Sequence, residues 1–148
     1  MIKRRNQVSG HAEAEYAADV ALAAQFDDLL AKARAAEQAF RKAQARAVPA
    51  SELYPLARNL DTALTDAMRA AYAAERAEIG PRGYEDRIYR RKAKARSAVH
   101  AWSDEAERLL TLRETHRLTG IPPAPLAGLP SAQPALGRPS GIVPHVPA

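Results

Sequence analysis

The fold is decided by residues 11–47, which read HAEAEYAADVALAAQFDDLLAKARAAEQAFRKAQARA. This stretch contains neither proline nor glycine, and alanine, the best helix former, dominates it. Apolar side chains such as Tyr16, Val20, Phe26 and Phe40 recur at the spacing of one helix face in coiled-coil-like packing. The pattern predicts a single amphipathic helix, about 55 Å long at 1.5 Å per residue.

Two further helices are expected downstream. After Val48–Pro49 the apolar spacing predicts a helix over residues 51–79, with Ser51 as its N-cap. The residues Gly80-Pro81-Arg82-Gly83 mark a stop and a turn, and a third helix is expected over residues 84–118. Three long helices joined by short connections predict an all-α, elongated up-down-up bundle over residues 11–118.

The composition predicts a thin core. Alanine accounts for 34 of the 148 residues, whereas leucine, isoleucine, valine and phenylalanine together number 27. Burying an alanine methyl removes little apolar area from water, while a buried leucine or phenylalanine contributes roughly 1.5–3 kcal/mol. Trp102, the single tryptophan, is therefore expected to be the main anchor of the core or, alternatively, of an interface. Neighbouring chains are expected to add stability.

Several classes of protein are disfavoured by what the sequence lacks. There is no cysteine, which excludes disulfides, thiol nucleophiles and cysteine metal sites. No stretch approaches the roughly 20 consecutive apolar residues that a membrane-spanning helix needs, so no membrane partner is expected. Residues 1–10 (MIKRRNQVSG) are basic without an apolar run behind them, and we interpret them as a flexible N-terminus rather than a secretory signal.

No motif for chemistry is present. The serines lie outside any nucleophile elbow, and no glycine-rich phosphate loop occurs. His100 and Asp104 share a helix face, but two ligands are too few for a metal site. We therefore predict that the protein is not an enzyme, with no catalytic residue, no metal site and no cofactor.

Positive charge is concentrated between residues 82 and 96. The formal net charge of the chain is +5, and seven bases stand in this segment: Arg82, Arg87, Arg90, Arg91, Lys92, Lys94 and Arg96. On one continuous helix, Arg87, Arg90, Arg91 and Lys94 would share a face. Such a basic patch could contact the phosphates of a nucleic acid, an acidic surface of a partner subunit, or solvent alone.

The C-terminal residues 119–148 have a different composition. They contain eight prolines, four glycines and no acidic residue. Proline excludes helix and sheet interiors, so the segment is either disordered or extended along a partner as a docking arm. In polyproline form it would reach roughly 90 Å. The residues expected to contact a partner are Ile121, Pro122, Pro123, Leu126, Leu129, Leu136, Ile142, Val143 and Val146.

A bundle of three helices with an extended C-terminal arm is similar in general plan to the small head-to-tail connector (adaptor) proteins of tailed bacteriophages. The resemblance covers the helices and the arm. It implies a ring of identical subunits under a portal, with arms that lie on the neighbouring ring, and a location in the virion after assembly in the host cytoplasm. Other minor capsid components fit nearly as well, and without a virion the expected location is cytoplasmic.

The sequence therefore favours a structural assembly protein that forms homo-oligomers and docks on a larger assembly such as a portal or capsid. The alternative is a nucleic-acid-binding accessory protein that uses the basic face of the third helix, with possible DNA contact. A third possibility is an adaptor whose Pro122-Pro123-Ala124-Pro125 segment recruits a signalling domain.

Overall fold

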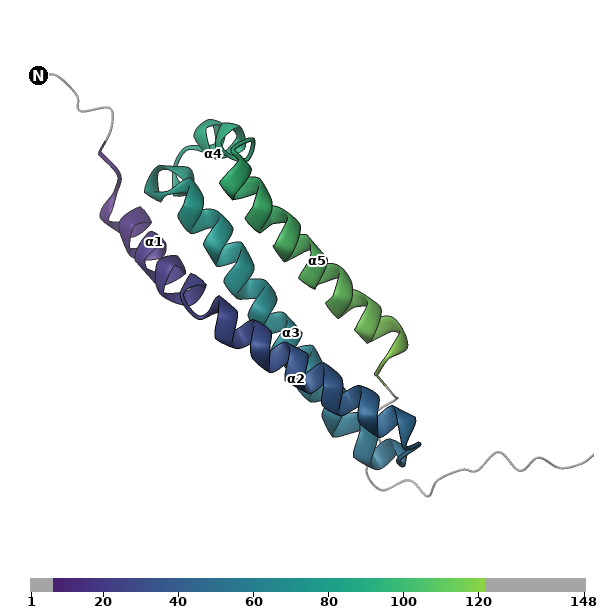
Figure 1. The fold of residues 1–148 in the computed structure, drawn as a ribbon. Coiled ribbons are helices and arrows are strands. Elements are labelled where there is room, and N and C mark those ends of the chain that lie inside the picture. Colours follow the sequence, from purple (N-terminus) through teal and green to yellow (C-terminus); the bar gives the residue numbers. More distant parts are fainter. Residues whose placement is uncertain (1–6, 122–148) are drawn as a thin grey trace, which may run out of the picture.

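The computed structural model of the chain describes residues 7–121, and these residues form helices and no strand (Figure 1). The predicted all-α class is thus confirmed for this part of the chain. The elements are α1 (Gly10–Ala23), α2 (Phe26–Ala45), α3 (Ala50–Ile79), the 3₁₀ helix η1 (Pro81–Tyr84), α4 (Arg87–Ala93) and α5 (Ser97–Thr119).

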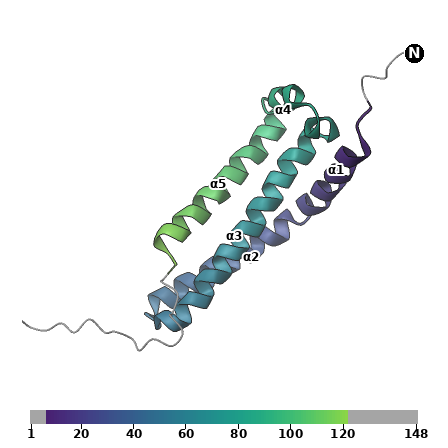
Figure 2. The same ribbon diagram turned by 180° about the vertical axis from the view of Figure 1, so that it is seen from behind.

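The helices form a bundle of three antiparallel rods. α1 and α2 follow one another along the first rod, α3 returns beside them, and α5 runs back along α3 (Figures 1 and 2). α3 is the central rod, since it contacts α1, α2 and α5. The expected up-down-up course is present, but the expected count of three helices is wrong, because two of the predicted helices are interrupted.

The helix predicted over residues 11–47 is broken at Ala24–Gln25. Here the amide of Gln25 donates to the carbonyl of Leu22 at 3.0 Å, which tightens the turn into a 3₁₀ step. No proline or glycine lies nearby, so the break has a tertiary cause. α1 packs on η1 and α3, whereas Phe26 at the start of α2 enters the core edge-on to Trp102, with 5.1 Å between the ring centroids.

The helix predicted over residues 84–118 is divided in three. Tyr84 belongs to η1, α4 ends at Ala93, and α5 begins at Ser97. The break before α5 falls at Arg96, which is extended and whose guanidinium donates to the last carbonyls of α3. Arg96 thus joins the break between α4 and α5 to the C-terminal end of α3.

Alanine fills most of the core, as the composition predicts. Among residues 7–121, eleven of the eighteen buried apolar residues are alanines. The main cluster joins Phe26, Phe40 and Leu60 with leucines and alanines of α3 and α5, and a smaller cluster joins Ile79, Ala93 and Val99 under α4. Small side chains let the helices approach closely, but they provide few large apolar contacts.

Helix α3 begins and ends at residues that constrain the backbone. Pro49 is its N-cap, so the prediction of Ser51 for that position is wrong by two residues. Beyond its last residue, Gly80 has a φ of +97°, which favours glycine, and Gly83 lies so close to Ile79 that a Cβ would stand 2.5 Å from its Cγ2. None of the described helices is long and apolar enough to cross a membrane.

Candidate functional site

The bundle has two ends of different chemistry, and the sequence-predicted sites are distributed between them. We define the α4 end as η1, α4 and the starts of α1 and α5. The hairpin end comprises the end of α2, the start of α3 and the end of α5 (Figure 1). The predicted basic patch lies at the α4 end, and the predicted docking arm begins at the hairpin end.

At the α4 end, two arginines of the basic patch bind main-chain carbonyls. Arg90 donates to the Gly83 carbonyl at 2.9 Å, and Arg96 donates to the carbonyls of Glu78 and Ile79 at 3.2 and 3.3 Å. These carbonyls belong to η1 and to the C-terminal turn of α3, where no intrahelical donor is available. The two guanidinium groups therefore hold η1, α4 and α5 onto the end of α3.

Two more cations of the patch have partners within the bundle. Arg82 pairs with Asp86 at 3.2 Å and lies over the ring of Tyr89, 4.6 Å from its centroid. Lys94 lies 3.8 Å from a carboxylate oxygen of the largely buried Glu75. Asp86 also accepts from the amide of Tyr89, which caps α4 and lowers the pKa of the Asp86 carboxyl together with Arg82.

The remaining cations of the patch face solvent. Arg87, Arg91 and Lys92 are exposed, and within residues 7–121 none of them makes a side-chain hydrogen bond or an ion pair. Ile88 lies among them and is 70% exposed. Within the predicted patch, Arg90 turns inward to the Gly83 carbonyl and Lys94, the C-cap of α4, reaches Glu75, whereas Arg87 and Arg91 project into solvent.

A polar contact that the sequence did not suggest joins three elements near the same end. Arg76 of α3 makes a two-pronged ion pair with Asp19 of α1, at 2.8 and 2.9 Å, and the Tyr84 hydroxyl of η1 donates to the same carboxylate. Burial raises the pKa of Asp19, but the hydrogen bonds from Arg76 and Tyr84 outweigh it and leave the pKa below its ordinary value. Burial raises the pKa of Tyr84 well above its usual range, and the bond to Asp19 adds to this effect.

At the hairpin end, α2 and α3 extend beyond the last turn of α5 (Figure 1). An open groove of about 280 Å³ lies here among the three helices. Its apolar residues are Phe40, Leu60, Leu64 and Leu112. Its polar residues are Glu37, Arg41, Gln44, Thr115, His116 and Thr119, and Gly120 completes it.

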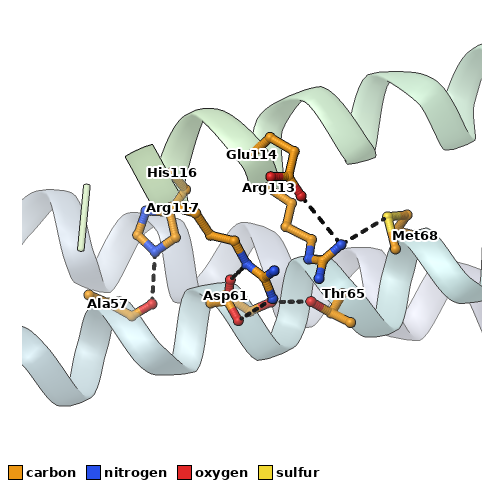
Figure 3. Close-up of polar contacts among 8 residues, drawn as sticks. All are labelled: Ala57, Asp61, Thr65, Met68, Arg113, Glu114, His116 and Arg117. Carbon is orange, nitrogen blue, oxygen red and sulfur yellow. Dashed lines mark hydrogen bonds and ion pairs between the residues drawn. The ribbon is translucent and has the colours of Figure 1, made fainter. Parts of the chain in front are cut away.

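His116 fixes the end of α5 at one wall of this groove. Its Nε2 lies 2.8 Å from the Ala57 carbonyl of α3, so Nε2 carries the proton and donates it (Figure 3). The ring also meets Phe40 of α2 edge-on, with centroids 5.2 Å apart. A Cβ on Gly120 would stand 2.4 Å from Nδ1 of His116, so this position requires glycine.

A polar seam between α3 and α5 lies beside His116 (Figure 3). Arg117 donates to both carboxylate oxygens of Asp61, at 2.6 and 3.2 Å. These hydrogen bonds lower the pKa of Asp61, against the opposing effect of burial, and the charge of Arg113 lowers it further. Arg113 reaches Glu114 and the sulfur of Met68, but its buried Nε has no partner within the described part of the chain.

The other predicted residues are placed as follows. Trp102 is partly buried and packs on the main core cluster, and Ile121 does the same. The eight remaining docking residues, Pro122 to Val146, lie outside the described residues, as do residues 1–6 of the basic N-terminus. His100 and Asp104 form an exposed pair at 3.3 Å, and within residues 7–121 no three potential ligands gather around a metal position.

Comparisons with protein-family models, with curated proteins and with solved structures find no match to this chain. An assignment of function therefore rests on the geometry of the two ends of the bundle. The α4 end presents cations around an isoleucine, and the hairpin end presents an open apolar groove beside the origin of the predicted arm. Both arrangements are suited to binding another chain.

Proposed function

We propose that this protein is a structural assembly component that forms oligomers and docks through the C-terminal arm, residues 119–148. The class that fits best is a virion component of the head-to-tail connector (adaptor) or minor capsid type. The observation that supports this proposal most is the incomplete covering of apolar side chains at the hairpin end, where the arm begins.

Large apolar side chains are scarce in this chain, yet two of them lie near the surface at this end. Leu112 is 43% exposed and Leu118 is 84% exposed. Single exposed leucines are ordinary on protein surfaces. Here, however, they accompany an apolar groove and lie within eight residues of Gly120, while alanine fills the interior. Apolar side chains that remain available in this way can serve as anchors for a partner.

The architecture supports the same proposal. The packed rods hold the start of the arm in a fixed place, because His116 ties the last turn of α5 to α3. The arm is long and carries one charge, Arg138. Proline lowers the entropy that such a segment loses on docking, so the scattered leucines, isoleucine and valines can occupy shallow pockets of a neighbouring subunit.

The test compares the full chain with a chain that ends at Ile121. We expect the full chain to self-associate at micromolar concentration and the shortened chain to remain a monomer with the same helicity per described residue. Analytical ultracentrifugation measures the mass, and far-ultraviolet circular dichroism measures the helicity. A matched control replaces Leu136, Ile142, Val143 and Val146 by serine in the full-length chain, and it should also remain monomeric. Equal masses for the full and shortened chains would refute the proposal.

A second candidate function, contact with nucleic acid, is favoured by one observation. Arg87, Arg91 and Lys92 project from α4 and keep their charges free for phosphates. Three cations form a small footprint, and four of the seven cations of the patch bind within the bundle. This candidate predicts binding that weakens steeply with salt, whereas arm-mediated assembly depends on apolar contacts and changes little.

A further inference from the structure

We infer that the first part of the arm, residues 122–129, occupies the hairpin-end groove of its own chain. This leaves residues 130–148 as the part that reaches a partner. The inference concerns the arm of the proposed function, and it rests on that proposal only for the role of residues 130–148.

The groove lies between α2 and the last turns of α5, over Leu60 and Leu64 of α3, and next to it the bundle lacks its third rod. α5 ends at Thr119, close to Ala57 of α3, whereas α3 begins at Ala50. About two turns of α3 and the facing end of α2 therefore continue without a helix from α5 beside them (Figure 1). Leu53 and Leu56 in these turns are only partly buried, although both side chains pack against the main core cluster. An apolar segment laid here would complete the core.

The chain leaves α5 at one end of this groove. Thr119 and Gly120 line it, and Ile121 already packs against the core cluster that contains Phe40 and Leu60. The segment from residue 122 onward therefore follows directly on residues that line the groove. A segment tethered so closely has an effective concentration in the millimolar range, so its own chain has the advantage over a second copy.

The sequence of residues 122–129, PPAPLAGL, suits the groove in shape and in charge. In a polyproline helix with three residues per turn, Pro123, Leu126 and Leu129 lie along one edge at intervals of about 9 Å. The segment carries no charge, in keeping with the apolar floor of Phe40, Leu60, Leu64 and Leu112. Its carbonyls would have no internal partner, and the exposed Gln44 at the groove offers an amide donor to them.

The absence of cysteine from the chain allows a direct test in the full-length protein. In the variant Gln44→Cys/Ala127→Cys one thiol lies at the groove and the other lies in the arm. Pro123, Leu126 and Leu129, the residues expected to contact the groove, are unchanged. We expect mild oxidation to form a disulfide within one chain. Its rate should be at least tenfold that of the matched control Arg87→Cys/Ala127→Cys, which places the first thiol at the α4 end. Non-reducing electrophoresis distinguishes an internal disulfide from a linked dimer.

Equal rates for the two pairs would overturn the inference. A disulfide-linked dimer in the Gln44→Cys/Ala127→Cys variant would also overturn it, because the groove would then hold the arm of another copy. As a second measurement, Leu126→Ser/Leu129→Ser should slow the internal cross-link several-fold, whereas Leu136→Ser should not. Failure of these tests leaves the proposed function intact, since that function is judged by the mass of the chain with and without residues 122–148.

Discussion

At the α4 end, charged side chains close the structure from within, whereas at the hairpin end apolar side chains remain partly open. Arg90 and Arg96 bind the carbonyls that end η1 and α3. The hairpin end has a groove over Phe40 and Leu60 instead. The α4 end thus satisfies its polar groups with residues of its own and exposes one large apolar side chain, Ile88, while the hairpin end has an apolar groove that another segment can cover.

Under the proposed function, this difference bears on which end another segment or chain would cover. Unpaired main-chain carbonyls at a helix terminus are satisfied by nearby donors or by water, and the α4 end supplies such donors. Partly covered apolar area is stabilised only by removing it from water, and the described residues do not remove it fully at the hairpin end. Assembly is therefore expected to begin where the arm leaves α5, and the cations of α4 are expected to contribute less.

Phe40→Ala at the hairpin end is expected to lower the free energy of unfolding more than any other substitution considered for comparing the two ends. Phe40 is buried, and it contacts both the core and His116. Replacing a buried phenylalanine by alanine costs about 3–5 kcal/mol, a large share of the stability of a small domain. Urea unfolding followed by circular dichroism should show this loss in the free energy of unfolding.

The matched substitution at the α4 end is Tyr89→Ala. The Tyr89 ring is only partly buried; it packs against the small cluster of Ile79, Ala93 and Val99 and meets the guanidinium of Arg82. An exposed contact of this kind contributes about 1 kcal/mol. If both substitutions destabilised the bundle equally, large apolar packing would matter as much at the α4 end, and the comparison would fail.

An intermediate effect is expected from Asp61→Asn in the polar seam between α3 and α5. The variant removes the carboxylate that Arg117 binds and should lower the free energy of unfolding at pH 7 by about 1–3 kcal/mol. The pKa of Asp61 in the folded protein is lower than its ordinary value, which the unfolded chain keeps. The stability from this group is therefore complete above about pH 4 and is lost as the pH falls through the folded pKa.

The difference in stability between the parent protein and Asp61→Asn should consequently shrink between pH 5 and pH 2. Urea unfolding at several pH values measures this change. The control is Asp104→Asn, because Asp104 is exposed on the same helix as Arg117, and it should alter stability by less than about 0.5 kcal/mol. A difference for Asp61→Asn that stayed constant with pH would show that the carboxylate charge is not what stabilises the seam.

Local sequence signals predicted much of the fold. The central helix was expected over residues 51–79 and extends over Ala50–Ile79, since its leucines and alanines follow one helical face up to Gly80. The breaks at Ala24–Gln25 and Arg96 were not predictable in this way. Each lies beside a contact with a distant residue, namely Phe26 with Trp102 and Arg96 with the end of α3. Such contacts override helix propensity without leaving a proline or glycine in the sequence.

The candidate sites were predictable to a smaller extent. Counting bases located the charge near α4, but the sequence could not show that Arg90 and Arg96 bind carbonyls while Arg87 and Arg91 face solvent. The groove was missed, because it forms only when the last turns of α5 pack beside α2 over Leu60 and Leu64 of α3. No local signal marked it, since the third helix expected over residues 84–118 is longer than the second, expected over residues 51–79.

The smallest effects should separate the two kinds of cation at the α4 end. Arg96→Gln loses charge-assisted bonds to Glu78 and Ile79 and should cost about 1 kcal/mol of stability. The triple variant Arg87→Gln/Arg91→Gln/Lys92→Gln should change stability by less than about 0.5 kcal/mol, because these side chains have no partner within residues 7–121. If the protein contacts duplex DNA, the same triple variant should reduce the slope of log affinity against log salt by about 3, while Arg96→Gln should reduce it by less than about 1. Equal slopes for the parent and the triple variant would assign the exposed cations to solvent or to an acidic protein surface, and assembly would then depend on the hairpin end.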